Sequence, residues 1–174
     1  MNELFLKKAV LLSILFLAFT QVQAQEEKFI TLYLYNFTKY IEWPGEYKKG
    51  DFVIDVLGHK SVYDRLDQML NAKKRGKQNF VVNNPTSVDE INSNCNILFV
   101  GHWKSKYLQE ALEQVTHKGT LIITEKPGML ADGSAINLII RNKKIQYEVK
   151  KSNLRRSGLS YSNDLTSLAT RVIN

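Results

Sequence analysis

Five polar or aromatic residues follow three apolar runs that we expect to be strands, and these residues are the best suited to bind a ligand. They are His59, His102, Trp103, Glu125 and Lys126. In an open parallel sheet, ligands bind beyond the carboxyl ends of the strands. A cleft there with an aromatic ring, two imidazoles and a charge pair would suit a small polar molecule. The alternative is that these are ordinary loop residues with separate roles, because nothing in the sequence shows that they converge.

Signatures of catalysis and of metal binding are missing from the sequence. A zinc site needs closely spaced His and Cys ligands, but the three histidines are scattered and Cys95 is the single cysteine. The Gly-x-Ser-x-Gly turn that carries a nucleophilic serine is absent, as is a glycine-rich phosphate loop. We therefore expect a protein that is not an enzyme and needs neither metal nor cofactor. A hydrolytic site would require a Ser or Asp that converges with a histidine in the folded chain.

Residues 1–24 have the composition of a cleavable secretory signal peptide. Two lysines provide a positive start, an apolar run covers residues 9–19, and residues 22–24 offer the small-residue pattern of a cleavage site. The apolar run is shorter than the roughly 20 residues that span a bilayer. An uncleaved membrane anchor is the alternative, and lipid anchoring is not expected because the cleavage point has no cysteine.

Removal of this segment leaves residues 25–174, a length that is usual for one domain with its own core. A single cysteine cannot form a disulfide within the chain. Because Cys95 begins an apolar run, we expect a small buried side chain there. A reactive thiol or a bridge between two chains is the alternative.

The positive charge is concentrated in the last fifth of the chain. Residues 25–140 contain 14 basic and 14 acidic side chains, whereas residues 141–174 contain eight basic and two acidic ones. Export argues against nucleic acid as the partner, so an acidic protein surface or an anionic membrane is the expected target. The docking candidates are Arg141, Lys143, Lys144, Lys150, Lys151, Arg155 and Arg156. The alternative is a solvated face that only aids solubility.

Residues 29–43 predict a strongly apolar helix. Its apolar side chains recur every three or four positions, and the Pro-Gly pair that follows ends it. A helix this apolar should pack against a sheet. Lys39, Glu42 and Trp43, at the end that we expect to be exposed, form a second candidate contact surface.

The rest of the chain alternates between predicted strands and helices. Strands are expected at 52–57, 80–82, 96–100 and 120–124, with helices at 61–70 and 105–115 and a basic turn at 73–77. This order predicts a single-domain, three-layer α/β fold with a mostly parallel sheet and helices on both faces. Residues 135–140 and 144–149 predict an antiparallel hairpin at the edge. The last segment predicts a closing helix interrupted at Gly158.

Residues 35–44, Tyr-Asn-Phe-Thr-Lys-Tyr-Ile-Glu-Trp-Pro, resemble the opening motif of the YfiR-like family of exported bacterial proteins. Shorter matches at 52–58, 95–100, 133–140, 145–149, 157–162 and 165–172 extend the resemblance over essentially all of residues 25–174. The resemblance implies a periplasmic α/β domain without catalysis that restrains a membrane-bound diguanylate cyclase through the periplasmic region of the cyclase. Disulfides are associated with that repression, and one cysteine cannot reproduce an internal disulfide, so redox control by this route is not expected.

Two hypotheses follow for the function of this chain. The first is a periplasmic regulator that docks on the extracytoplasmic region of a membrane signalling protein, either a diguanylate cyclase or a sensor kinase. The second is a periplasmic module that binds a small molecule in the cleft at the strand ends. Nucleic acid is not an expected partner, and formation of a homodimer is left open.

Overall fold

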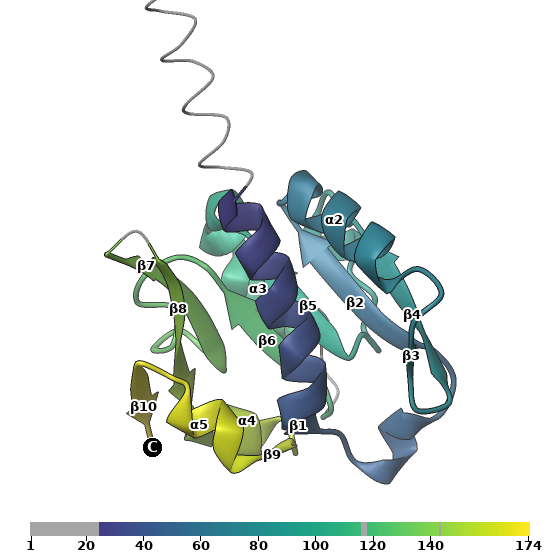
Figure 1. The fold of residues 1–174 in the computed structure, drawn as a ribbon. Helices are drawn as coiled ribbons and strands as arrows, with labels where there is room; N and C mark the ends of the chain where they lie inside the picture. Colours follow the sequence, from purple (N-terminus) through teal and green to yellow (C-terminus); the bar gives the residue numbers. More distant parts are fainter. Residues whose placement is uncertain (1–24, 116–117, 143) are drawn as a thin grey trace, which may run out of the picture.

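The computed structural model describes residues 25–115, 118–142 and 144–174 (Figure 1). The predicted signal peptide and two residues named from the sequence, His117 and Lys143, lie outside these ranges. The described residues contain no helix that is both long enough and apolar enough to cross a membrane.

An eight-stranded sheet forms the centre of the fold. Its strand order is β10-β8-β7-β6-β5-β2-β4-β3. The bounds are β2 (Phe52–Leu57), β3 (Lys74–Arg75), β4 (Gln78–Asn83), β5 (Ile97–Val100), β6 (Leu121–Thr124), β7 (Ile136–Arg141), β8 (Lys144–Lys150) and β10 (Arg171–Ile173). The pairs β3–β4 and β7–β8 are antiparallel, and the other five are parallel. The predicted mostly parallel sheet with an antiparallel hairpin is confirmed.

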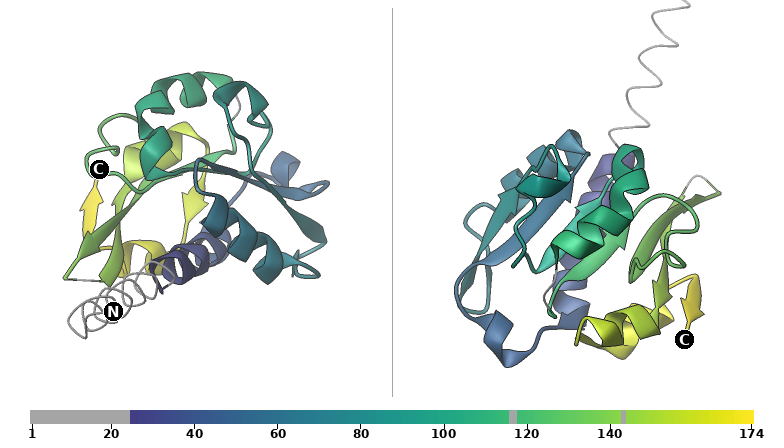
Figure 2. Two further views of the ribbon diagram at one scale, coloured as in Figure 1. Left: turned by 90° about the horizontal axis from the view of Figure 1, so that it is seen from above. Right: turned by 180° about the vertical axis from the view of Figure 1, so that it is seen from behind.

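Helices cover both faces of this sheet, as predicted (Figure 2). A helix over residues 25–40 and α2 (Lys60–Leu70) lie on one face, and α3 (Leu108–Gln114) lies on the other. Shorter helical segments are η1 (Gly45–Lys48), η2 (Val88–Glu90), η3 (His102–Tyr107), α4 (Lys151–Arg156) and α5 (Asn163–Ser167). Every residue of β5 and β6 is buried, because these central strands are covered on both sides.

The end of the N-terminal helix differs from the prediction. The helix stops at residue 40, and β1 (Ile41–Glu42) pairs with β9 (Ser160–Tyr161). Trp43 is therefore turned inward and is only 2% exposed. Its indole N–H donates to the Gly119 carbonyl oxygen at 2.7 Å. Its ring packs edge to face with Phe52, with 4.8 Å between the ring centres. The expectation that Trp43 is exposed is wrong, because the chain is extended after residue 40.

Arg75 completes the packing around Trp43. Its guanidinium group lies 4.7 Å from the centre of the Trp43 ring. The same group donates to the carbonyl oxygens of Thr38 and Ile41, at 3.0 and 3.3 Å. Carbonyls at the end of a helix lack partners within the helix, so this side chain satisfies groups that would otherwise need water. Burial lowers the pKa of Arg75 from its ordinary value. We call Trp43, Arg75 and Phe52 the aromatic lock.

The last segment also differs from the prediction. The expected closing helix is replaced by α4, β9, α5 and β10, and Gly158 provides a turn with φ of +68°. Val172 belongs to β10, which pairs with β8 and extends the sheet beyond the hairpin. The spacing of Leu165, Leu168 and Val172 is typical of a helix, but residue 172 is extended because pairing with β8 outweighs this local preference.

Cys95 is buried, as predicted. It is 1% exposed and packs in the core on the α3 side of the sheet. Burial raises the pKa of its thiol well above the ordinary value. A thiol that is both buried and protonated is inaccessible to another chain while the fold is intact.

Candidate functional site

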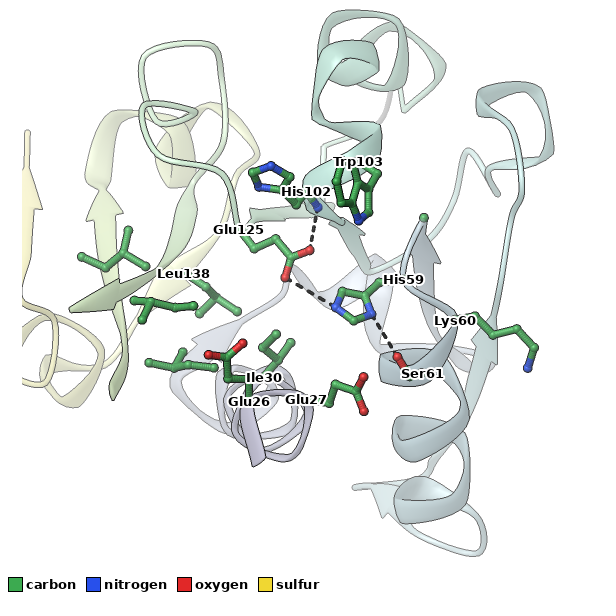
Figure 3. A pocket seen from close by; sticks show the side chains of 14 residues that line it. Glu26, Glu27, Ile30, His59, Lys60, Ser61, His102, Trp103, Glu125 and Leu138 are labelled. Carbon is green, nitrogen blue, oxygen red and sulfur yellow. Dashed lines mark hydrogen bonds and ion pairs between the residues drawn. The ribbon is translucent and has the colours of Figure 1, made fainter. Parts of the chain in front are cut away.

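A cleft of about 560 Å³ opens at the carboxyl ends of β2, β5 and β6 (Figure 3). His59, His102, Trp103 and Glu125 line it, so the structure brings together four of the five residues named from the strand ends. Lys126 follows Glu125 but is not among the lining residues. The parallel strands end side by side, which explains why residues far apart in sequence meet here.

Two glycines allow the chain to pass closely at the floor of this cleft. Gly58 has φ of +78°, and a Cβ added there would collide with the Lys104 side chain. A Cβ on Gly101 would lie 2.8 Å from the Gly58 carbonyl oxygen. A larger residue at Gly101 would push the ends of β2 and β5 apart, whereas one at Gly58 would displace the Lys104 side chain and strain the backbone at its positive φ.

Glu125 occupies the centre of the cleft. Its side chain is 13% exposed, one oxygen accepts the His102 backbone N–H at 2.6 Å, and the other lies 3.8 Å from His59 Nε2. Burial raises the pKa of Glu125 from its ordinary value, and the neighbouring imidazoles only partly offset this effect. The carboxylate is thus desolvated and only weakly compensated by the protein.

A serine, a histidine and a glutamate stand in sequence across this cleft, so a hydrolytic site has to be considered. Ser61 Oγ lies 3.5 Å from His59 Nδ1. Both this distance and the distance from His59 to Glu125 exceed the reach of a nucleophile activated by its base. Ser61 also follows His59 by two residues at the start of α2, so their proximity follows from the local chain. We assign no catalytic role to these residues.

The wall of the cleft opposite α2 is apolar and was not expected from the sequence. The N-terminal helix contributes Ile30, and the β7–β8 hairpin contributes Leu138, Ile139, Ile140 and Ile145. Ile140 is 62% exposed, and Trp103, at the rim of the same cleft, is 83% exposed. No local pattern marks these residues as cleft residues, because only the sheet order places the hairpin beside the other strand ends.

Acidic residues from the first turn of the N-terminal helix complete the cleft. Glu26 and Glu27 line it together with Glu125. Glu27 forms an ion pair with Arg65 at 3.2 Å, whereas Glu26 helps to raise the pKa of Glu125. Lys60 points away from the centre and forms an ion pair with Asp64 at 2.6 Å. Within the described ranges, no group of three or more His, Cys, Asp or Glu side chains could hold a metal ion.

The basic residues named from the last fifth of the chain do not form one patch. Arg141 and Lys144 pair at the tip of the β7–β8 hairpin. At the other end of β8 lie Lys150, Lys151, Arg155 and Arg156. The two groups are separated by the length of β8, about 20 Å. Lys143 lies outside the described residues.

A second groove, of about 590 Å³, lies at the far end of the N-terminal helix. Lys39 and Glu42, both exposed, line it. The structure adds three further lysines that the sequence did not link to them, namely Lys48, Lys74 and Lys77. Tyr35 and Phe80 provide aromatic surface between these charges. We call this the basic groove, and Trp43 lies buried behind it in the aromatic lock.

Comparison with known proteins identifies a family and several similar solved structures. A family model described as YfiR/HmsC-like matches residues 27–170. A conserved domain protein from Vibrio cholerae O1 biovar El Tor is 9% identical, with a TM-score of 0.48 over 70% of this chain and 54% of that one. The ABC domain from Streptococcus pneumonia in complex with L-Trp is 11% identical, with a TM-score of 0.50 over 70% and 56%. The chain thus spans just over half of each of these two structures, and at 11% identity the second bears on the fold alone.

Proposed function

The chain belongs to the YfiR/HmsC-like family, and from this membership we propose that it docks on the extracytoplasmic region of a membrane-bound signalling protein and modulates its output. At the family level, these proteins are periplasmic regulators of diguanylate cyclases rather than enzymes. The proposal includes export with removal of residues 1–24. The partner is a diguanylate cyclase or a sensor kinase.

The basic groove is the proposed docking surface. The clustering of lysines in this groove is the observation that supports the assignment. Four lysines from three separate segments surround Tyr35 and Phe80 at one end of the molecule. Charged groups around an apolar or aromatic centre are typical of a protein interface, in which charge steers the encounter and apolar contact holds it. The complementary surface is an acidic segment with apolar side chains.

The groups at the two ends of β8 are weaker candidates for this role. Arg141 and Lys144 stand at a hairpin tip, far from the basic residues of α4. Neither group lines the basic groove. They therefore serve as matched controls for charge in the experiment below.

Docking would control the partner by a population shift. A regulator that binds one signalling state of its partner more tightly than the other favours that state while bound, and its release frees the other. The sign of the regulation depends on which state exposes the acidic segment.

Capture from solubilised membranes tests the proposal. The exported protein is used as bait, and captured membrane proteins are identified by mass spectrometry and examined for a cyclase or kinase domain. We expect the combined variant Lys39→Glu, Lys74→Glu and Lys77→Glu to reduce recovery of that partner by about tenfold or more, because each reversal turns attraction into repulsion.

The control variant reverses an equal number of charges on α4, with Lys151→Glu, Arg155→Glu and Arg156→Glu. It should retain the partner. Equal loss in both variants would mean that net charge, and not the basic groove, drives binding. Failure of the unmodified protein to recover any membrane signalling protein would overturn the proposed function.

A further inference from the structure

The cleft at the strand ends has two chemically different sides. Isoleucine and leucine side chains from the N-terminal helix and the β7–β8 hairpin form one side. Glu125, His59 and the start of α2 form the other, and the exposed Trp103 stands at the rim (Figure 3). A volume of about 560 Å³ lies within the range that holds small organic ligands. The occupant should therefore have an apolar body and a polar end.

The charges around the polar end favour a cation. Three carboxylates line the cleft, of which Glu27 is paired with Arg65, and the lysine in its lining is paired with Asp64 on the outer side. Glu26 and Glu125 both line the cleft and face the same space in Figure 3, and the like charge of Glu26 adds a small increase to the pKa of Glu125. An ammonium group between them would remove this repulsion and give the desolvated Glu125 a charged donor.

An anion would meet a mixed environment at the same place. The start of α2 offers unpaired backbone N–H groups, which by themselves attract negative charge. Glu125 nevertheless occupies the centre of the cleft, where His59 separates it from that helix start, and Glu26 reaches the cleft from the N-terminal helix (Figure 3). Two carboxylates that line the cleft disfavour an anion more than the partial charge of one helix end favours it.

We propose that this cleft binds an amphipathic organic amine, with the ammonium group between Glu26 and Glu125 and the apolar body against Ile30, Leu138 and Ile145. The indole of Trp103 closes over the ligand from the rim. Indole rings favour both apolar bodies and cationic groups. This binding site is separate from the basic groove, so it stands or falls independently of the proposed docking.

Calorimetric titration of the purified protein with three probes of similar size tests the charge preference. The probes are 2-phenylethylamine, 2-phenylethanol and phenylacetate, which carry a positive, a neutral and a negative polar end. We expect the amine to bind at one site and at least about tenfold more tightly than the alcohol. Phenylacetate should bind most weakly. An affinity for phenylacetate that equals that for the amine would overturn the proposal, as would no detectable binding of the amine at millimolar concentration.

Substitutions locate the site. Glu125→Gln keeps the shape and the bond from His102 but removes the charge, and it should weaken amine binding about tenfold or more. Trp103→Ala should weaken it about fivefold. Glu113→Gln, at an exposed position on α3 outside the cleft, is the control and should leave binding unchanged. Unchanged affinity in Glu125→Gln, with the variant shown to be folded by its unfolding midpoint, would place the amine elsewhere and refute the assignment.

Discussion

The two ends of the helix over residues 25–40 meet opposite surroundings, about 24 Å apart. At its last turn, Arg75 caps the carbonyl oxygens and Trp43 fills the space behind, so this end is closed by packing. At its first turn, Glu26 and Glu27 face an open cleft in which a buried carboxylate lacks a full counter-charge. The last turn of this helix therefore stabilises the fold, whereas its first turn faces carboxylates that are accessible to a ligand and contribute little to stability.

The family motif at residues 35–44 covers the closed end of this helix. The motif residues Phe37 and Trp43 are buried, so the most recognisable run in the sequence is mainly a packing signature. The residues proposed to bind an amine all lie outside it. The motif does contribute Tyr35, Lys39 and Glu42 to the basic groove, so it bears on the proposed docking surface but not on the amine site.

The largest effect should come from paired tryptophan truncations, one at each end. Trp43→Ala should lower the free energy of unfolding by about 3–5 kcal/mol, because it leaves a cavity and removes the bond to Gly119. Trp103→Ala should change it by less than about 0.5 kcal/mol, because this side chain is 83% exposed. Urea unfolding monitored by circular dichroism measures both values. Similar losses in the two variants would remove the contrast between the closed and open ends.

A smaller loss is expected from the cap of the aromatic lock. Arg75→Met keeps an unbranched stem over Trp43 but leaves the carbonyls of Thr38 and Ile41 without their donor. Hydrogen bonds from a charged group contribute about 1.5–3 kcal/mol, so a loss in that range should appear in urea unfolding. Arg155→Met, at an exposed position on α4, is the matched control and should change stability little. If Arg75→Met left the free energy of unfolding unchanged, water would satisfy the two carbonyls as well as the guanidinium group does.

The smallest effect, and one of opposite sign, is expected at the open end. The pKa of Glu125 is raised by burial and by Glu26, against the opposing influence of His59 and His102. A carboxyl with a higher pKa in the folded chain contributes stability fully below its unfolded pKa, and this contribution is lost as pH rises through the folded pKa. Glu125→Gln should therefore leave the protein equally or slightly more stable at neutral pH, by less than about 1 kcal/mol.

The same substitution should flatten the dependence of stability on pH from the ordinary pKa of a glutamate upward. Unfolding curves at several pH values, with Glu113→Gln as the control, measure this change. A marked loss of stability in Glu125→Gln at neutral pH would mean that the ionised carboxylate supports the fold, and the two ends would no longer differ in kind.

The sequence predicted the sheet better than it predicted the surfaces. Apolar runs such as 97–100 and 121–124 are strands because continuous burial leaves few other options. The four cleft residues at strand ends were also predictable, since parallel strands end together. The apolar wall from residues 138–145 was not, because it depends on which edge of the sheet the hairpin joins. The position of Trp43 was missed because pairing between β1 and β9 ends the helix, and such pairing over a long sequence distance leaves no local signal.

The burial of Cys95 has a practical consequence for observing this molecule. A protonated thiol at 1% exposure reacts with an alkylating reagent only when the core around it opens. Because the chain has one cysteine, every labelling event reports on that single position. The rate of labelling thus measures how often the α3 side of the fold opens under native conditions. Cys95 is therefore a built-in probe for the rate at which this part of the core opens.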